Sequence, residues 1–170
     1  MPDEFQPKPI LRTLRAHEVD FVLIGGVAGM AHGSAYPSFD LDVAYGRDPA
    51  NLERLADALR ELDAKLRGAP VDVLFQLDAR TLESGANFTF TTPYGSLEIL
   101  GDAAGAPAYE RLKADAAQAE IDGEPVRVAS LDHLIAMKEA AGRTKDKLMA
   151  TEYRTLSDVL RAPTGDSGSA

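Results

Sequence analysis

Apolar residues in the first half of the chain follow two spacings, one typical of helices and one typical of strands. Residues 10–17 repeat apolar positions every three or four residues, whereas residues 20–26 form an apolar run that ends in two glycines. The first pattern predicts an amphipathic helix and the second a short buried strand. The elements expected next are a tight helix over 27–33, a strand over 40–45, and a leucine-striped helix that begins at Asp48-Pro49 and continues to Gly68.

The second half begins with β-rich stretches and then returns to helical spacing. The expected elements are strands at 71–77, 87–93 and 95–100, a helix over 106–119, a hairpin turning at Asp122-Gly123, a helix that Ser130 caps and Gly142 interrupts, and a last helix over 145–160. We therefore expect one α/β (α+β) domain over residues 8–161, with a mixed β-sheet and flanking helices. Residues 162–170 are expected to form a disordered C-terminal tail.

Two carboxylates lie two positions apart on one predicted strand. Asp40 and Asp42 project to the same face, while Leu41 and Val43 pack on the other. Glu98 alternates with apolar neighbours on a later strand, and we expect it to share the face of the two aspartates. Mg²⁺ prefers oxygen ligands and usually keeps water or substrate phosphates as well. The pattern therefore predicts a site for divalent cations.

The glycine pair at the end of the first strand has a matching role. Gly25 and Gly26 occupy a predicted strand-to-helix turn, where the lack of a Cβ allows a phosphate group to approach backbone N–H groups closely. The glycines and the carboxylates together favour a nucleotide-binding site with bound metal.

Composition narrows the classes of function. The 170 residues include no cysteine, so any metal must bind oxygen or histidine ligands. The formal net charge of −9 argues against broad, salt-driven attraction to nucleic acid. No apolar run approaches the roughly 18 residues that a membrane span needs, and the N-terminus is acidic and polar. We expect a cytoplasmic protein without a membrane partner.

These residues resemble a known superfamily. The glycine pair, the downstream Asp-Leu-Asp and the acidic residue on a later strand are similar to the signature of the nucleotidyltransferases. The stretch VASLDHLIAMKEAAGRTKDKLMATEYRTL looks like the C-terminal half of abortive-infection (AbiEii/MenT-like) nucleotidyltransferase toxins and related bacterial domains, so the resemblance covers about residues 8–160.

The resemblance implies a polymerase-beta-like fold and a two-metal mechanism with Mg²⁺ and a nucleoside triphosphate. It implies that Asp40 and Asp42 are metal ligands and that Lys138 contacts phosphate. It also places Ser34 and Lys145 in the nucleotide site, with Asp146 at its edge. The implied acceptor is a tRNA 3′ end, a protein or a small molecule, and an antitoxin protein is a candidate partner.

Alternative interpretations remain open at this stage. Lys138 interrupts an apolar helix face, where a lysine can cover the core with its stem and extend its ammonium to water. Asp102 is the alternative to Glu98 as third carboxylate. Tyr36 stands where similar chains often have arginine, and this favours a second hypothesis, a catalytically weak or inactive module that binds a nucleotide or a protein.

Overall fold

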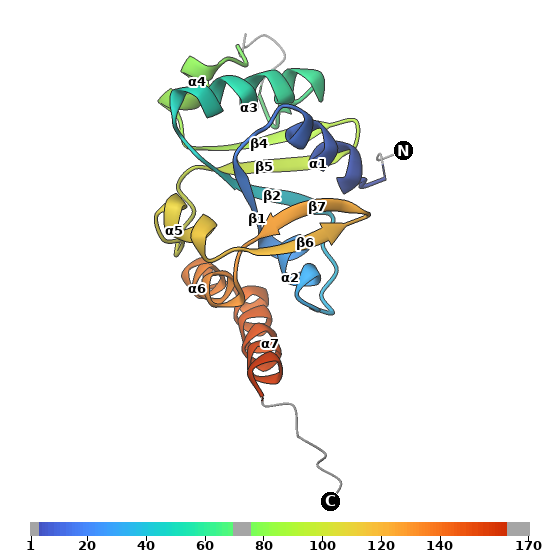
Figure 1. Cartoon of the computed structure of the whole chain (residues 1–170), viewed down its shortest axis with the longest axis vertical. Coiled ribbons are helices and arrows are strands. Elements are labelled where there is room, and N and C mark those ends of the chain that lie inside the picture. The colour runs from blue at the N-terminus through green and yellow to red at the C-terminus, as the bar shows by residue number, and fades with distance from the viewer. Residues whose placement is uncertain (1–3, 70–75, 163–170) are drawn as a thin grey trace, which may run out of the picture.

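The computed structural model describes residues 4–69 and 76–162, and in this part of the chain seven strands form one mixed sheet (Figure 1). Its strands lie in the order β3-β4-β5-β2-β1-β7-β6. The central strand β2 pairs parallel to β5 and antiparallel to β1, which in turn pairs parallel to β7. This mixed α/β architecture confirms the expected fold class. The strands are β1 (Phe21–Ile24), β2 (Asp40–Tyr45), β3 (Lys65–Leu66), β4 (Asn87–Thr92), β5 (Gly95–Leu100), β6 (Ala117–Ile121) and β7 (Glu124–Val128).

Two helices from the first half of the chain pack together and help to cover the core. In α1 (Pro7–Ala16) the apolar residues at helical spacing are fully buried, and α1 contacts α3 (Pro49–Glu61) and β7. The Asp48 side chain accepts a hydrogen bond from the backbone N–H of Asn51 and so caps α3, as expected. The short α4 (Ala79–Ser84) packs against α3.

The remaining helices lie toward the opposite end of the molecule (Figure 1). They are α2 (Gly25–Ala31), α5 (Tyr109–Ala114), α6 (Leu131–Ala141) and α7 (Thr144–Arg161). Ser130 caps α6 through the backbone N–H of His133, and Gly142 ends this helix with a φ of 71°, a conformation that favours glycine. The chain therefore turns at Gly142, and α6 and α7 are two packed helices.

Two features of the sequence prediction need correction. The helix expected to continue to Gly68 ends at Glu61, and Leu66 belongs to β3, where it pairs with Phe90. The helix expected over 106–119 is reduced to α5, because residues 117–121 pair with β7 as a hairpin strand instead. Long-range pairing thus overrides local helical spacing in both places. The strand expected at 71–77 falls mostly outside the described residues, as does the C-terminal tail.

The hairpin between β6 and β7 turns where expected. Asp122 and Gly123 both have positive φ values, 51° and 83°, which is the backbone geometry of a tight two-residue hairpin turn.

Among the described residues, no helix combines the length and the apolar character that crossing a bilayer requires.

Candidate active site

Asp42 and Glu98 lie side by side near the centre of the sheet. They are register partners on the parallel strands β2 and β5, so their side chains point to the same face. Leu41 and Ile99 belong to the other face and are fully buried. Asp40 lies two residues before Asp42, on the same face, and is exposed. The three carboxylates proposed as metal ligands thus share one face of the sheet.

The electrostatics of this face centre on Asp42. Burial, together with the nearby negative charges of Glu98 and Asp40, raises the pKa of its carboxyl to about 7, while the charge of Lys138 opposes the shift. The negative charges of the other two carboxylates on this face thus act together on Asp42. A cation bound here would favour the ionised carboxylate.

The backbone of Gly25 lies in close contact with the carboxylate of Asp42. Its φ is +73°, and a Cβ on this residue would lie 2.1 Å from Oδ2 of Asp42. A Cβ on Gly26 would likewise lie 2.6 Å from Oγ of Ser38. Contacts of this length are not sustainable, so both positions need glycine. The two glycines therefore allow β2 and the loop before it to pack closely against the start of α2. Local sequence patterns do not reveal this reason for the glycines.

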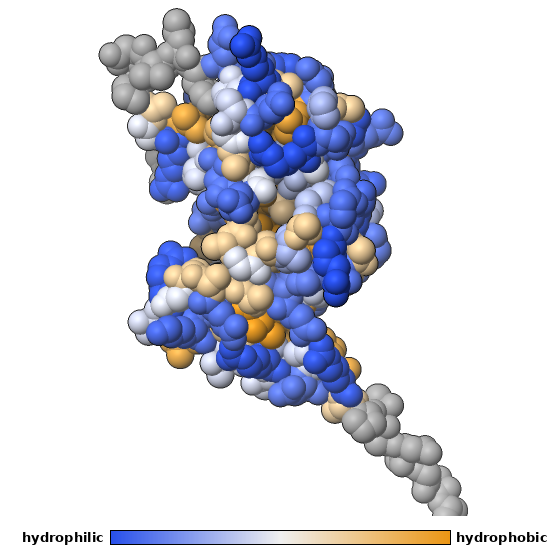
Figure 2. Space-filling model, turned by 90° about the vertical axis from the view of Figure 1, so that its left-hand side faces the viewer, coloured by the Kyte–Doolittle hydropathy of each residue, from blue (hydrophilic) through white to orange (hydrophobic). Residues whose placement is uncertain are grey.

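A cleft of about 180 Å³ opens over these residues and is bounded by α6. Gly25, Asp42 and Glu98 line its sheet side, and Lys138 lines its helix side. The rest of the lining comes from Ile24, Asn87, Leu100, Asp102, Ala103, Ala104, Leu134 and Met137. Figure 2 shows a hollow at mid-height of the molecule, bordered in part by apolar residues. The cleft is thus polar on its carboxylate floor and largely apolar on its walls.

A buried carboxylate holds the lysine of the cleft. Nζ of Lys138 lies 3.4 Å from Oδ1 of Asp146, whose side chain is only 1% exposed. Arg143 donates to the same carboxylate from Nε at 2.7 Å and from its backbone N–H at 3.2 Å. The hydrogen bond from Arg143, followed by the charge of Lys138, lowers the pKa of Asp146. Asp146 thus stays ionised and restrains two cations.

Comparison with known proteins bears on what this arrangement is. No protein-family model matches the chain, and no curated protein matches it either. Among solved structures, the lincosamide antibiotic adenylyltransferase LnuA in its lincomycin-bound form is similar over 90% of this chain and 99% of its own, with a TM-score of 0.61 and 12% identity. A putative nucleotidyltransferase from Thermotoga maritima is similar over 88% of this chain and 90% of its own, with a TM-score of 0.55 and 15% identity. An antigenic nucleotidyltransferase-like protein from Paracoccidioides brasiliensis is similar over 89% of this chain and 73% of its own, with a TM-score of 0.53 and 15% identity.

The chain has the nucleotidyltransferase fold. This confirms, for the fold alone, the resemblance inferred from the glycine pair and the Asp-Leu-Asp motif. Within the fold, Asp42, Glu98 and Lys138 come together in one cleft, which Asp40 does not line.

Three residues expected to bind the nucleotide, Gly26, Ser34 and Lys145, do not line that cleft. The hydroxyl of Ser34 donates to the Glu152 carboxylate of α7, and the backbone N–H of Ala35 donates to the same carboxylate at 2.9 Å. Lys145 is exposed on the first turn of α7, beyond the break at Gly142, and does not line the cleft. Their roles in nucleotide binding stay predictions that this geometry does not favour.

The donor set suits a cation that brings part of its own coordination shell. In residues 4–69 and 76–162, no group of three or more acidic or histidine side chains is gathered closely enough to hold a metal ion. Asp42 and Glu98 are within hydrogen-bonding reach of each other, whereas Asp40 acts on Asp42 through its charge alone. Mg²⁺ commonly takes one or two carboxylates and completes its octahedron with water and phosphate oxygens. The pair fits such an ion.

Sequence reasoning missed part of the cleft wall. Asn87 and Met137 line the cleft, and Asp102 lines it as well, although the sequence suggested Asp102 only as a replacement for Glu98. Asn87 is the first residue of β4 and pairs with Leu100, the last residue of β5, which Gly101 and Asp102 follow. The position of Asn87 beside Asp102 follows from the pairing register of β4 and β5, which the sequence alone does not give.

Proposed function

We propose that this protein is a metal-dependent nucleotidyltransferase that moves a nucleotidyl group from a nucleoside triphosphate to a small-molecule acceptor. The observation that carries the proposal is the meeting of Asp42, Glu98 and Lys138 in one cleft of a nucleotidyltransferase fold. Carboxylates that hold a cation, set opposite a fixed ammonium, are suited to bind a triphosphate. The fold needs no protein nucleophile for this chemistry.

Each residue of the cleft has a distinct part in this proposal. Asp42 and Glu98 would hold Mg²⁺, with Asp40 adding charge and, as the resemblance implies, a ligand to a two-ion site. When bound, such ions neutralise phosphate charge and lower the pKa of an acceptor hydroxyl. Lys138 binds phosphate oxygens and orients the triphosphate along the cleft. The glycine at position 25 lets the Asp42 carboxylate lie directly against the backbone at the start of α2.

The charge of the protein favours a small acceptor over a nucleic acid. A net charge of −9 opposes a polyanionic tRNA, since such binding depends on neutralising many phosphates. The similar structure of LnuA is an adenylyltransferase that was captured with lincomycin, a small molecule. We therefore propose a small-molecule acceptor for this chain.

A thermal-shift experiment tests the proposal without knowledge of the acceptor. ATP, CTP, GTP and UTP are each added with and without Mg²⁺ to the wild-type protein, to Asp42→Asn and to Asp122→Asn, which removes the same charge on the exposed β6–β7 turn. A ligand at 100 times its Kd stabilises by about 2.7 kcal/mol, or roughly 5 °C or more in a chain of this size. We expect such a shift for wild type and Asp122→Asn, with Mg²⁺ only.

Loss of the shift in Asp42→Asn locates the nucleotide in the carboxylate cleft. If wild-type protein shows no Mg²⁺-dependent shift with any of the four nucleotides, nucleotidyl transfer is rejected. The second hypothesis, an inactive binding module suggested by Tyr36, is then preferred, because a module that binds a partner protein needs no Mg²⁺–nucleotide complex.

A further inference from the structure

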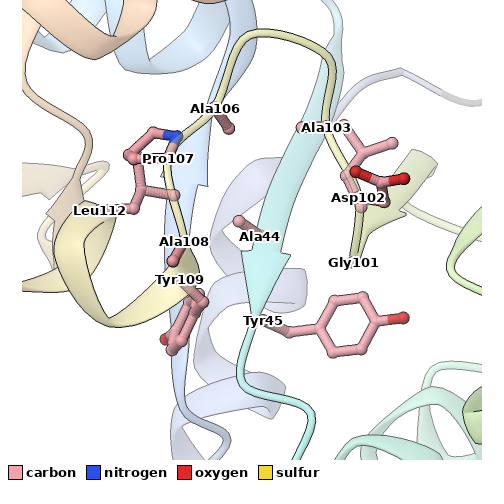
Figure 3. A pocket seen from close by; sticks show the side chains of 11 residues that line it. Ala44, Tyr45, Gly101, Asp102, Ala103, Ala106, Pro107, Ala108, Tyr109 and Leu112 are labelled. Atoms are coloured by element: carbon pink, nitrogen blue, oxygen red, sulfur yellow. The ribbon is translucent and has the colours of Figure 1, made fainter.

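A second cavity adjoins the proposed nucleotide cleft. Its volume is about 230 Å³, and it shares Leu100, Asp102 and Ala103 with the cleft. Figure 3 shows β2 between its two walls, with Gly101 and Asp102 on one side and Ala108 and Tyr109 on the other. The proposed reaction brings together two substrates, and the structure holds two joined cavities.

The wall of this second cavity is a loop, residues 101–108, that is built from small residues and held in place at both ends. At the first end, the Gly101 N–H donates to the Ala86 carbonyl at 2.9 Å. Asn87 brackets the backbone of Asp102, accepting from its N–H at 3.0 Å and donating to its carbonyl at 2.9 Å. At the second end, the hydroxyl of Tyr109 donates to Asp20 at 2.7 Å. The loop is thus a fixed wall.

The middle of the loop packs against α6. Gly105 has a φ of +80°, and a Cβ on it would lie 2.5 Å from the carbonyl oxygen of Ala136. This close contact requires glycine and sets the distance between the loop and the helix that bears Lys138. Both cavities are therefore bounded by parts of the protein that hold each other in position.

Asp102 is the one charged residue among the described residues that line the second cavity. The Tyr45 hydroxyl is occupied, because it donates to the Ala86 carbonyl and accepts from Arg47, and the Tyr109 hydroxyl is held by Asp20. The Asp102 carboxylate is exposed, and within residues 4–69 and 76–162 it has no hydrogen bond or ion pair. An unpaired carboxylate on a backbone held by Asn87 thus stands at the junction of the two cavities.

The charges assign the two substrates to the two cavities. A triphosphate is attracted to Lys138 and repelled by a free carboxylate, so it belongs on the Gly25 and Lys138 side of the cleft. We propose that the second cavity holds the acceptor, and that Asp102 binds a positively charged amine of that acceptor. This inference rests on the proposed nucleotidyl transfer, because it is that reaction which calls for an acceptor.

The cavity also limits the size of the acceptor. About 230 Å³ lies below the roughly 300–1,000 Å³ of sites for drug-sized ligands, so one ring fits in it. The acceptor class is therefore a small hydroxylated amine, with a single sugar-like or shorter body. Its apolar parts would contact the alanines and the two tyrosine rings, its amine would meet Asp102, and its hydroxyl would face the cleft that holds Glu98.

Amide NMR titrations of the 18.2 kDa protein test this assignment without nucleotide or metal. The probes are glucosamine and ethanolamine, each matched to an uncharged partner, glucose and ethylene glycol. We expect saturable shifts of the Ala103 and Ala106 amides with at least one amine, and at least tenfold weaker binding of its uncharged partner. A hydrogen bond to a charged group is worth about a factor of ten or more in affinity.

Three variants separate the contributions. Asp102→Asn should weaken amine binding about tenfold, Ala106→Leu should abolish it by filling the cavity, and Asp122→Asn, with the same loss of charge on a distant turn, should bind as wild type does. Equal binding of amine and uncharged partner, unaltered binding by Asp102→Asn, or the absence of saturable shifts at Ala103 and Ala106 overturns the proposal.

The same samples distinguish failure of this inference from failure of the proposed function. Mg²⁺–ATP and Mg²⁺–GTP are titrated afterwards. If both bind and neither amine does, the acceptor assignment fails while nucleotidyl transfer stands. If Asp102→Asn selectively weakens Mg²⁺–GTP, the cavity holds a purine base and the acceptor assignment is wrong.

Discussion

A Cβ added to Gly25 would collide with the carboxylate of Asp42, at 2.1 Å from its Oδ2. The turn that begins α2 and the strand that carries the proposed metal ligands are thus fitted to each other across the sheet, since Ile24 pairs with Asp42 in the antiparallel ladder. The position of the Asp42 carboxylate therefore depends on the absence of a side chain at Gly25 as much as on β2.

Gly25→Ala should therefore lower both stability and nucleotide binding. The positive φ alone costs an alanine about 1–2 kcal/mol, and the clash with Asp42 adds to this. Gly68→Ala is the matched control, because Gly68 has a similar φ of +77° with nothing within 4 Å of its added Cβ. Urea unfolding and Mg²⁺–nucleotide titration measure the two effects. An equal stability loss in both variants, with binding intact, contradicts the close fit.

Asp42→Asn should remove transfer activity and make the metal-free protein more stable at alkaline pH. The pKa of Asp42 is raised to about 7 from its ordinary value of 3.8, so its contribution to stability is present below pH 4 and is lost as the pH rises through 7. From pH 5 to pH 8 wild type should lose about 2–3 kcal/mol more stability than Asp42→Asn. Chemical unfolding at the two pH values, without divalent metal, measures this difference. Parallel losses in the two proteins would argue that Asp42 is ionised normally.

Lys138→Met should weaken Mg²⁺–nucleotide binding about tenfold or more, because a charge-assisted contact to phosphate is lost. Stability should change by less than about 1 kcal/mol, since methionine keeps the apolar stem and Arg143 still pairs with Asp146. Lys145→Met serves as the control, for Lys145 is exposed and lies outside the cleft. Unchanged affinity in Lys138→Met would show that this lysine only covers the core.

Asp146→Asn should destabilise the protein at neutral pH by about 1–3 kcal/mol, because a buried acceptor of charged hydrogen bonds is lost. The pKa of Asp146 is lowered in the folded state, so its contribution is present above the unfolded value and is lost as the pH falls through the folded one. The stability gap between wild type and Asp146→Asn should therefore close below about pH 4. A gap that persists unchanged at pH 3 contradicts the ion-pair role.

Local sequence rules predicted the elements that carry the proposed chemistry. The alternation around Asp40, Asp42 and Glu98 was sufficient to place them on one face, because side-chain direction on a strand has a period of two. Ser130 and Asp48 were recognisable as caps for the same local reason.

Features that depend on distant segments were beyond those rules. Three contacts of this kind depend on sheet register or on helix packing. They are the close approach of Gly25 to Asp42, the hydrogen bond from Ser34 to Glu152, and the hydrogen bonds between Asn87 and the backbone of Asp102. The helix expected over 106–119 failed because its last residues gain backbone partners in β7 that local spacing cannot reveal.

The contact between Glu152 and the Ser34 loop links residues 118 positions apart in the chain. Tyr153, beside it, packs so tightly on α2 that a Cβ on Gly29 would lie 2.3 Å from its hydroxyl oxygen. During synthesis at about 5–20 residues per second, the loop leading to Asp40 therefore waits on the order of ten seconds for the helix that anchors it. The proposed active site is thus completed only after α7 has been made, and a nascent chain that stops short of α7 has its strands but no anchored loop.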